Sequence, residues 1–194
     1  VDVASVKGGA IPIDPMSYKY MIITEADKRS RKDKAFQNKV SNSLKIDTVD
    51  FTQYDIIFLA GGWGAAYDLG QSDVLAQKVS EAYYGSDAII GGGCHGPLGL
   101  INAKDKDGGL LIKGRKMSGV TDKQIDELKI KFTPLHPESA LKAAGVKYEA
   151  STAQKDLFAT HTVVDDEGRF VTGQNQNSGH VTAHEMMRLA KATK

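Results

Sequence analysis

The sequence is poor in cysteine, because Cys94 is the only one among 194 residues. A single thiol excludes an intrachain disulfide, which favours a reducing, cytoplasmic setting. Apolar runs are too short for a membrane span, which takes about 20 residues. The formal net charge is only +1, with 25 basic and 24 acidic side chains. The sequence therefore predicts neither a membrane span nor the basic surface that nucleic acid requires.

Internal repeats, low-complexity tracts and linkers are also missing, so we expect one domain over residues 1–194. This length, with 41% hydrophobic residues, suffices for a single α/β domain with a sizeable core. The chain opens without Met on Val1–Val6, a strand-like alternation that is too short and too polar for a signal peptide. We therefore expect a preceding segment, which would make the domain N-terminally incomplete.

The periodicity of apolar residues predicts alternating strands and helices. The clearest buried strand is Tyr54–Ala60, and a short apolar run covers 87–90. Hairpins are expected over 110–120 and 162–172. Helices are predicted over 28–44, 72–84, 121–127, 138–144 and 181–192.

The stretch Gly91-Gly92-Gly93-Cys94-His95-Gly96-Pro97 lies between an apolar run and a helix-compatible stretch. A strand, a sharp turn carrying a reactive side chain and a helix together form a nucleophile elbow. The glycines permit the turn, and the start of a helix would lower the pKa of the thiol. We interpret Cys94 as a catalytic or redox-reactive thiol with His95 beside it. The alternative is a small buried residue in a glycine turn.

A second glycine cluster, Gly61-Gly62-Trp63-Gly64, directly follows the strand over 54–60. Open α/β sheets place their ligand-binding loops at the carboxyl ends of strands. A phosphate-binding loop would need the Lys-Ser/Thr ending that this cluster lacks. We therefore predict an oxyanion hole in which the N–H groups of Gly62 and Trp63 face Cys94.

The other four histidines give weaker signals. His180 and His184 are four residues apart on a predicted helix and share a face, but no third ligand is evident. We therefore predict no metal and no cofactor. His136 and His161 are interpreted as structural residues.

Four motifs occur in the order found in the ThiJ/PfpI superfamily. They are Gly61-Gly62-x-Gly64, Cys94-His95-Gly96-Pro97, Ser118-Gly119-x-Thr121-Asp122 and Thr172-Gly173-Gln174-Asn175-x-x-Ser178. The Cys-His-Gly-Pro form resembles the glyoxalase III and heat-shock chaperone branch, which is related to class I glutamine amidotransferases. This resemblance covers nearly the whole chain. It implies an α/β fold, a flavodoxin-like three-layer sandwich with a mostly parallel sheet and a site at the carboxyl ends of the strands.

The resemblance also implies residue roles. Cys94 would be the nucleophile and His95 its partner, with the oxyanion loop at Gly62 and Trp63. Trp63 stands where the family commonly has His, which changes the wall of the pocket.

The family's third catalytic element is a Glu that follows its first strand, and that strand, its helix and the Glu are absent from this sequence. We expect a missing N-terminal segment to supply both a strand and this catalytic Glu. Asp122 and Asp126 are both candidates for the acid that supports His95.

By resemblance, the expected activity is the conversion of methylglyoxal to lactate without glutathione, by a lyase with a Cys nucleophile. Its partner would be a small dicarbonyl or aldehyde substrate, and a homodimer is the assembly that we consider. The alternatives are a stress-related holding chaperone and a Cys–His amidase or peptidase.

Overall fold

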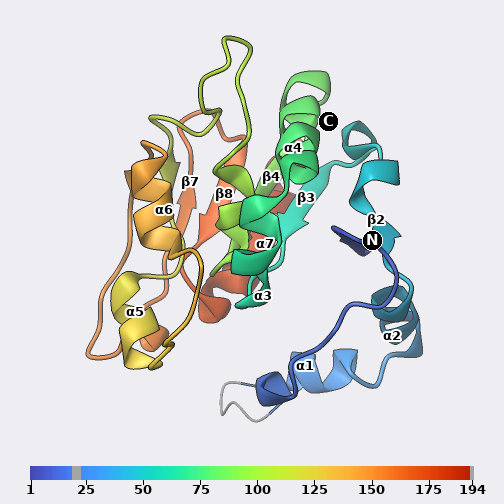
Figure 1. Cartoon of the computed structure of the whole chain (residues 1–194), viewed down its shortest axis with the longest axis vertical. Helices are drawn as coiled ribbons and strands as arrows, with labels where there is room; N and C mark the ends of the chain where they lie inside the picture. Colours follow the sequence, from blue (N-terminus) through green and yellow to red (C-terminus); the bar gives the residue numbers. More distant parts are fainter. Residues whose placement is uncertain (19–22, 193–194) are drawn as a thin grey trace. The chain divides into compact units, whose positions relative to one another are not determined.

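The computed structural model describes residues 1–18 and 23–192, and the chain divides into two compact units, 1–49 and 50–194 (Figure 1). None of the helices in these described ranges is both long and apolar enough to cross a membrane. A single domain over 1–194, and a segment preceding it, stay predictions.

The first unit contains two short parallel strands, β1 (Ala4–Ser5) and β2 (Leu44–Lys45). Between them lie two helices, α1 (Glu25–Ser30) and α2 (Lys34–Ser41). The expected strand over 1–6 is therefore confirmed only in its central part.

The single helix predicted over 28–44 is wrong, because Asp33 interrupts it. The side chain of Asp33 accepts hydrogen bonds from the backbone N–H groups of Ala35 and Phe36, and so it caps a new helix at Lys34. Leu44, the last residue of the predicted helix, lies in β2 and is exposed.

The second unit is built on a four-stranded sheet with the order β3-β4-β8-β7. Its strands are β3 (Ile56–Leu59), β4 (Ile89–Gly93), β7 (Thr162–Val164) and β8 (Phe170–Gly173). The first three strands in this order are parallel, and β7 pairs antiparallel with β8 as the hairpin prediction expects. The register places Gly93 of β4 opposite Gly173 of β8, so both strands end at the same edge.

Helices cover both faces of this sheet. On one face, α7 (Gly179–Ala192) packs Met186 and Ala190 against Ile89 and Val171. On the other face, Phe170 stacks on Tyr83, which belongs to α4 (Asp73–Gly85). This alternation along β4 and β8 gives the layered α/β arrangement with a mostly parallel sheet that was predicted.

The other α-helices and strands of this unit lie outside the four-stranded sheet. They are α3 (Gly64–Tyr67), β5 (Lys116–Met117), α5 (Asp122–Glu127), α6 (Pro137–Ala143) and β6 (Lys147–Tyr148). The hairpin predicted over 110–120 is wrong, because β5 pairs in parallel with β6 and residue 110 instead forms a bridge with 104. Thr121 caps α5 by accepting a hydrogen bond from Gln124 N–H.

Glycine in β4 is required by close approach of the neighbouring strand. A Cβ added at Gly91 would overlap the carbonyl oxygen of Val171 in β8. Gly91→Ala should therefore lower the free energy of unfolding by about 3 kcal/mol or more, since backbone atoms must move to admit the methyl group. Urea denaturation measures this change.

The matched control is Gly179→Ala at the start of α7, where an added Cβ meets no atom of the described residues within 4 Å. Its stability should stay within about 1 kcal/mol of wild type. Equal effects of the two substitutions would contradict the close-packing account.

Candidate functional site

Cys94 directly follows β4 and adopts a left-handed backbone conformation, with φ of 59°. Non-glycine residues rarely adopt this conformation, and it persists only where neighbouring contacts hold it. Here Cys94 N–H donates to Gly173 O at 3.0 Å, and Cys94 O accepts from Val120 N–H at 3.0 Å. Two of the sequence motifs therefore hold the cysteine turn through backbone hydrogen bonds.

The glycine cluster after β3 lies against this turn. A Cβ added at Gly61 would stand 2.8 Å from Cys94 Cβ, so only glycine leaves room for the thiol. Gly62 has φ of 105°, and its N–H donates a hydrogen bond to Cys94 Sγ. Trp63 is half-buried at the start of α3. Gly62 thus lies beside the sulfur, and its role as an oxyanion donor stays a prediction.

His95 completes the turn beside the sulfur. Its Nδ1 lies 3.3 Å from Cys94 Sγ, which is within hydrogen-bonding range for sulfur. The side chain is buried, with 3% exposure. Its other ring nitrogen, Nε2, is also buried and has no hydrogen-bond partner within residues 1–18 and 23–192. For Nδ1 to accept the thiol proton, the hydrogen of the neutral ring must be on Nε2. The Nε2–H group is then the other polar group of the ring.

Burial sets the electrostatics of this pair. It raises the pKa of Cys94 to about 11, although N–H groups of Gly62 and His95 partly oppose the shift. Burial also lowers the pKa of His95 to about 4, with a further lowering from the charge of His136. Both shifts disfavour the charged forms. At neutral pH the resting pair is a neutral thiol and a neutral imidazole.

The expected lowering of the Cys94 pKa is therefore wrong. The turn is followed by a 3-10 helix of five residues, Gly96–Leu100, instead of a long α-helix. Such a short element contributes little dipole. Desolvation of the sulfur outweighs the two backbone donors.

Neither predicted supporting acid bonds the free nitrogen of His95. Asp122 instead lies beside His136, with 3.6 Å between Asp122 Oδ1 and His136 Nδ1. Asp126 is exposed on α5.

Sequence reasoning missed Asp156, which is 2% exposed. Its carboxylate accepts hydrogen bonds from Thr121 at 2.7 Å, Lys123 at 3.0 Å and Thr152 at 2.8 Å. Burial alone would raise its pKa, but these donors outweigh burial and lower the pKa to about 2. Asn175 Nδ2 donates to the carbonyl oxygen of Asp156 at 3.0 Å. Asp156 thereby links the cap of α5 to the loop that follows β8.

The histidines outside the turn lie in different places. The rings of His180 and His184, both on α7, lie with 4.2 Å between their centroids and are tilted by 30°. His161 Nε2 lies 3.7 Å from Glu149 Oε2. The described ranges contain no group of three or more His, Cys, Asp or Glu that could hold a metal ion.

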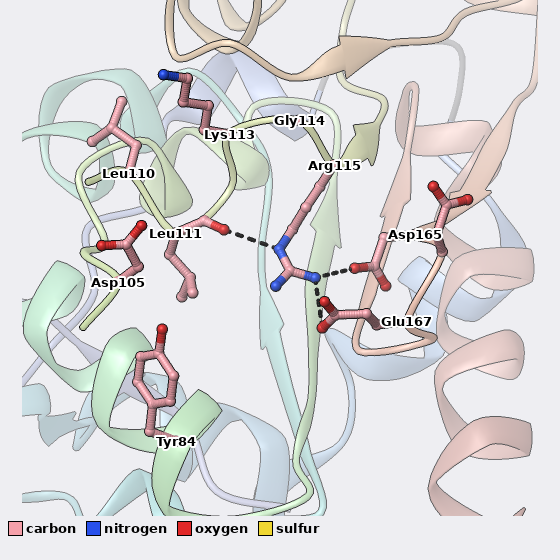
Figure 2. Close-up of a pocket in the computed structure, with 10 residues that line it drawn as sticks. Tyr84, Asp105, Leu110, Leu111, Lys113, Gly114, Arg115, Asp165 and Glu167 are labelled. Atoms are coloured by element: carbon pink, nitrogen blue, oxygen red, sulfur yellow. Dashed lines mark hydrogen bonds and ion pairs between the residues drawn. The ribbon is translucent and has the colours of Figure 1, made fainter. Parts of the chain in front are cut away.

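Arg115 lines a hollow of about 610 Å³ (Figure 2). Arg115 donates to Leu111 O at 2.9 Å and forms ion pairs with Asp165 at 2.5 Å and Glu167 at 2.9 Å. These acids precede β8, whereas Cys94 follows β4, which runs parallel to it. The hollow therefore lies at the opposite edge of the sheet. Its arginine is already fully paired.

Comparison with known proteins gives a consistent result. The family model described as DJ-1/PfpI family matches residues 16–188. Glyoxalase 3 of Candida albicans is 32% identical over 158 residues, which cover 78% of this chain and 64% of that protein. A probable glutathione-independent glyoxalase of Schizosaccharomyces pombe, hsp3104, is 27% identical over 167 residues, covering 83% of this chain and 73% of that one.

A solved structure is also similar. The crystal structure of glyoxalase III from Candida albicans has a TM-score of 0.83 and 26% sequence identity, and the match covers 97% of this chain and 79% of that one. By sequence, the chain spans less than two thirds of the length of the Candida protein.

Burial of neutral His95 predicts a stability loss at acid pH. The unfolded chain takes up this proton below pH 6.5, but the folded chain does so only near pH 4. The contribution of neutral His95 to the free energy of unfolding is therefore fully present above pH 6.5. It falls by about 3 kcal/mol as the pH drops to 4, at about 1.4 kcal/mol per pKa unit. Urea denaturation across this range should show the fall in wild type.

His95→Gln should lack that component of the fall. His184→Gln, at an exposed position of α7, should retain it. Parallel pH dependences of wild type and His95→Gln would contradict a buried neutral imidazole.

The raised pKa of Cys94 predicts that its thiol is alkylated slowly. At pH 7, iodoacetamide should alkylate folded Cys94 at least roughly tenfold more slowly than the same residue in the urea-unfolded chain. The rate should keep rising with pH toward about 11. A folded chain that reacts faster than the unfolded chain at pH 6 would show an activated thiolate instead.

Proposed function

The chain belongs to the DJ-1/PfpI family, and we propose that it is a glutathione-independent glyoxalase that converts methylglyoxal to lactate through Cys94. The observation that carries this proposal is the 3.3 Å contact between Cys94 Sγ and His95 Nδ1, next to the N–H of Gly62. The names of the relatives described above support the same substrate class. A thiol, a base and an oxyanion donor together suit addition to an aldehyde.

In the first step, Cys94 Sγ attacks the aldehyde carbon C1, and the thiol proton passes to His95 Nδ1. A bond forms between sulfur and C1, and the carbonyl electron pair moves to oxygen. The N–H of Gly62, which donates to the sulfur in the resting site, stabilises the developing oxyanion in this proposal. Because both resting groups are neutral, His95 acts as a general base during the attack.

The hemithioacetal then isomerises to a thioester. The proton on C1 leaves and a proton arrives at C2, so the carbonyl group moves from C2 to C1. We assign this transfer to the Glu that the family resemblance implies, with His95 assisting. Water then hydrolyses the thioester, which releases lactate and returns the proton to Cys94 Sγ. Overall, one methylglyoxal and one water give one lactic acid, with no external oxidant or reductant.

Lactate production separates this activity from the two alternatives. A holding chaperone would suppress aggregation of unfolded clients even after the thiol is blocked. An amidase or peptidase would cleave amide substrates with the same Cys–His pair. Blocking Cys94 should abolish lactate production.

Cys94→Ser should lower kcat/KM for methylglyoxal by about a hundredfold or more, because a hydroxyl is a much weaker nucleophile beside a base of such low pKa. Circular dichroism and urea denaturation check that the variant folds. A variant that retains more than about a tenth of wild-type activity would contradict the covalent mechanism.

A further inference from the structure

His180 and His184 lie side by side on α7. Their ring centroids are 4.2 Å apart, and the ring planes are tilted by 30°. Residues four positions apart on an α-helix share one face, and α7 is a regular helix over Gly179–Ala192. The contact between the two rings therefore follows from the geometry of the helix.

The rest of α7 gives this pair a fixed support. Met186 and Ala190 pack against the sheet. Thr182 Oγ1 donates to Ser178 O at 2.9 Å, which joins the first turn of the helix to the loop before it. The two histidines are on the exposed side of the helix, so water and dissolved ions reach both rings.

Neighbouring charged side chains leave both imidazoles available. Glu185 and Arg188, on the same helix, pair with each other at 2.6 Å. Apart from the contact between the two rings, no hydrogen bond or ion pair within residues 1–18 and 23–192 involves His180 or His184. The ring nitrogens can therefore bind an external ligand without breaking an interaction of the fold.

We propose that His180 and His184 form a binding site for a divalent transition-metal ion of the Cu²⁺, Ni²⁺ and Zn²⁺ class, which clamps the first turns of α7. Imidazole suits these ions, whereas Mg²⁺ and Ca²⁺ prefer oxygen ligands. A ring nitrogen binds Zn²⁺ at about 2.0–2.1 Å, so two nitrogens on one ion lie about 3–4 Å apart. The centroid spacing of 4.2 Å is close to that separation. Rotation of the two exposed side chains brings one nitrogen of each ring to a common ion.

The number of protein ligands sets the strength of this site. The sequence predicts no metal because it offers no third protein ligand, but two imidazoles suffice for an ion whose other positions are filled by water. Such a site is open, unlike a structural zinc site with four protein ligands. The ion therefore exchanges with solvent and adds stability to a helix that already folds. The unfolded chain does not hold the two rings together, so binding should raise the Tm.

Two other pairs in the chain could compete for the same ions. His161 Nε2 lies 3.7 Å from Glu149 Oε2, and Cys94 Sγ lies 3.3 Å from His95 Nδ1. A thiolate is a strong metal ligand. The test therefore uses the full chain carrying Cys94→Ser as the parent protein, and His161→Gln in that parent as the matched control.

Calorimetric titration with ZnCl₂ at pH 7.5 should show one ion bound per chain. His184→Gln should weaken this binding about tenfold or more, because even the residues that support metal ligands are worth about 10- to 100-fold in affinity. His161→Gln should bind Zn²⁺ as tightly as the parent does. Mg²⁺ should give no binding signal. Circular dichroism checks that each variant keeps its helix content.

Line broadening by Cu²⁺ locates the ion, because a paramagnetic ion broadens the nearest nuclear magnetic resonance signals most. At substoichiometric Cu²⁺, the amide signals of residues 179–185 should broaden first in the parent and should be spared in His184→Gln. Equal Zn²⁺ affinities of the parent and His184→Gln would overturn the proposal, as would broadening centred away from α7. Absence of Zn²⁺ binding at millimolar concentration would overturn it too. Neither readout involves a dicarbonyl substrate, so this result is independent of the proposed glyoxalase activity.

Discussion

The structure around the site depends on one constraint, the packing of a partly buried thiol and a buried imidazole 3.3 Å apart in a turn with a left-handed cysteine. The turn requires close approach of β3 and β8 to β4, and glycine at 91 and 92 makes that approach possible, because a Cβ at either position would overlap a carbonyl oxygen of β8 or β3. The carbonyl of Gly173 and the N–H of Val120 then fix the cysteine backbone. Sheet packing and site geometry are therefore two consequences of the same contacts.

Burial also decides how the site can react. It raises the pKa of Cys94 and lowers that of His95, so the resting pair carries no charge and Cys94 rests as a neutral thiol. Reaction then requires proton transfer to His95 as the sulfur attacks. Any group that changes the basicity of His95 therefore changes the reactivity of Cys94.

Much of the site was predictable because its residues follow strands. Cys94, His95 and Gly62 come directly after parallel strands, whose carboxyl ends share one edge of the sheet, so their meeting follows from topology. The pKa of Cys94 was not predictable, since burial comes from residues far away in the sequence. Asp156 was missed for the same reason, because Thr121 lies 35 positions before it. Local sequence patterns gave wrong predictions in two places. The cap at Asp33 divides the helix predicted over 28–44. Strand β5 pairs with β6, far along the chain, instead of forming the predicted hairpin.

The central claim is that Cys94 forms a covalent bond with an α-oxoaldehyde. Its most direct test is mass spectrometry of the chain, quenched in acid during turnover of methylglyoxal and then digested. The account predicts a peptide containing Cys94 whose mass has increased by one methylglyoxal, and no such peptide after prior alkylation of the thiol. Turnover to lactate with Cys94 unmodified at every quench time, and adducts found only on lysine or arginine side chains, would contradict it.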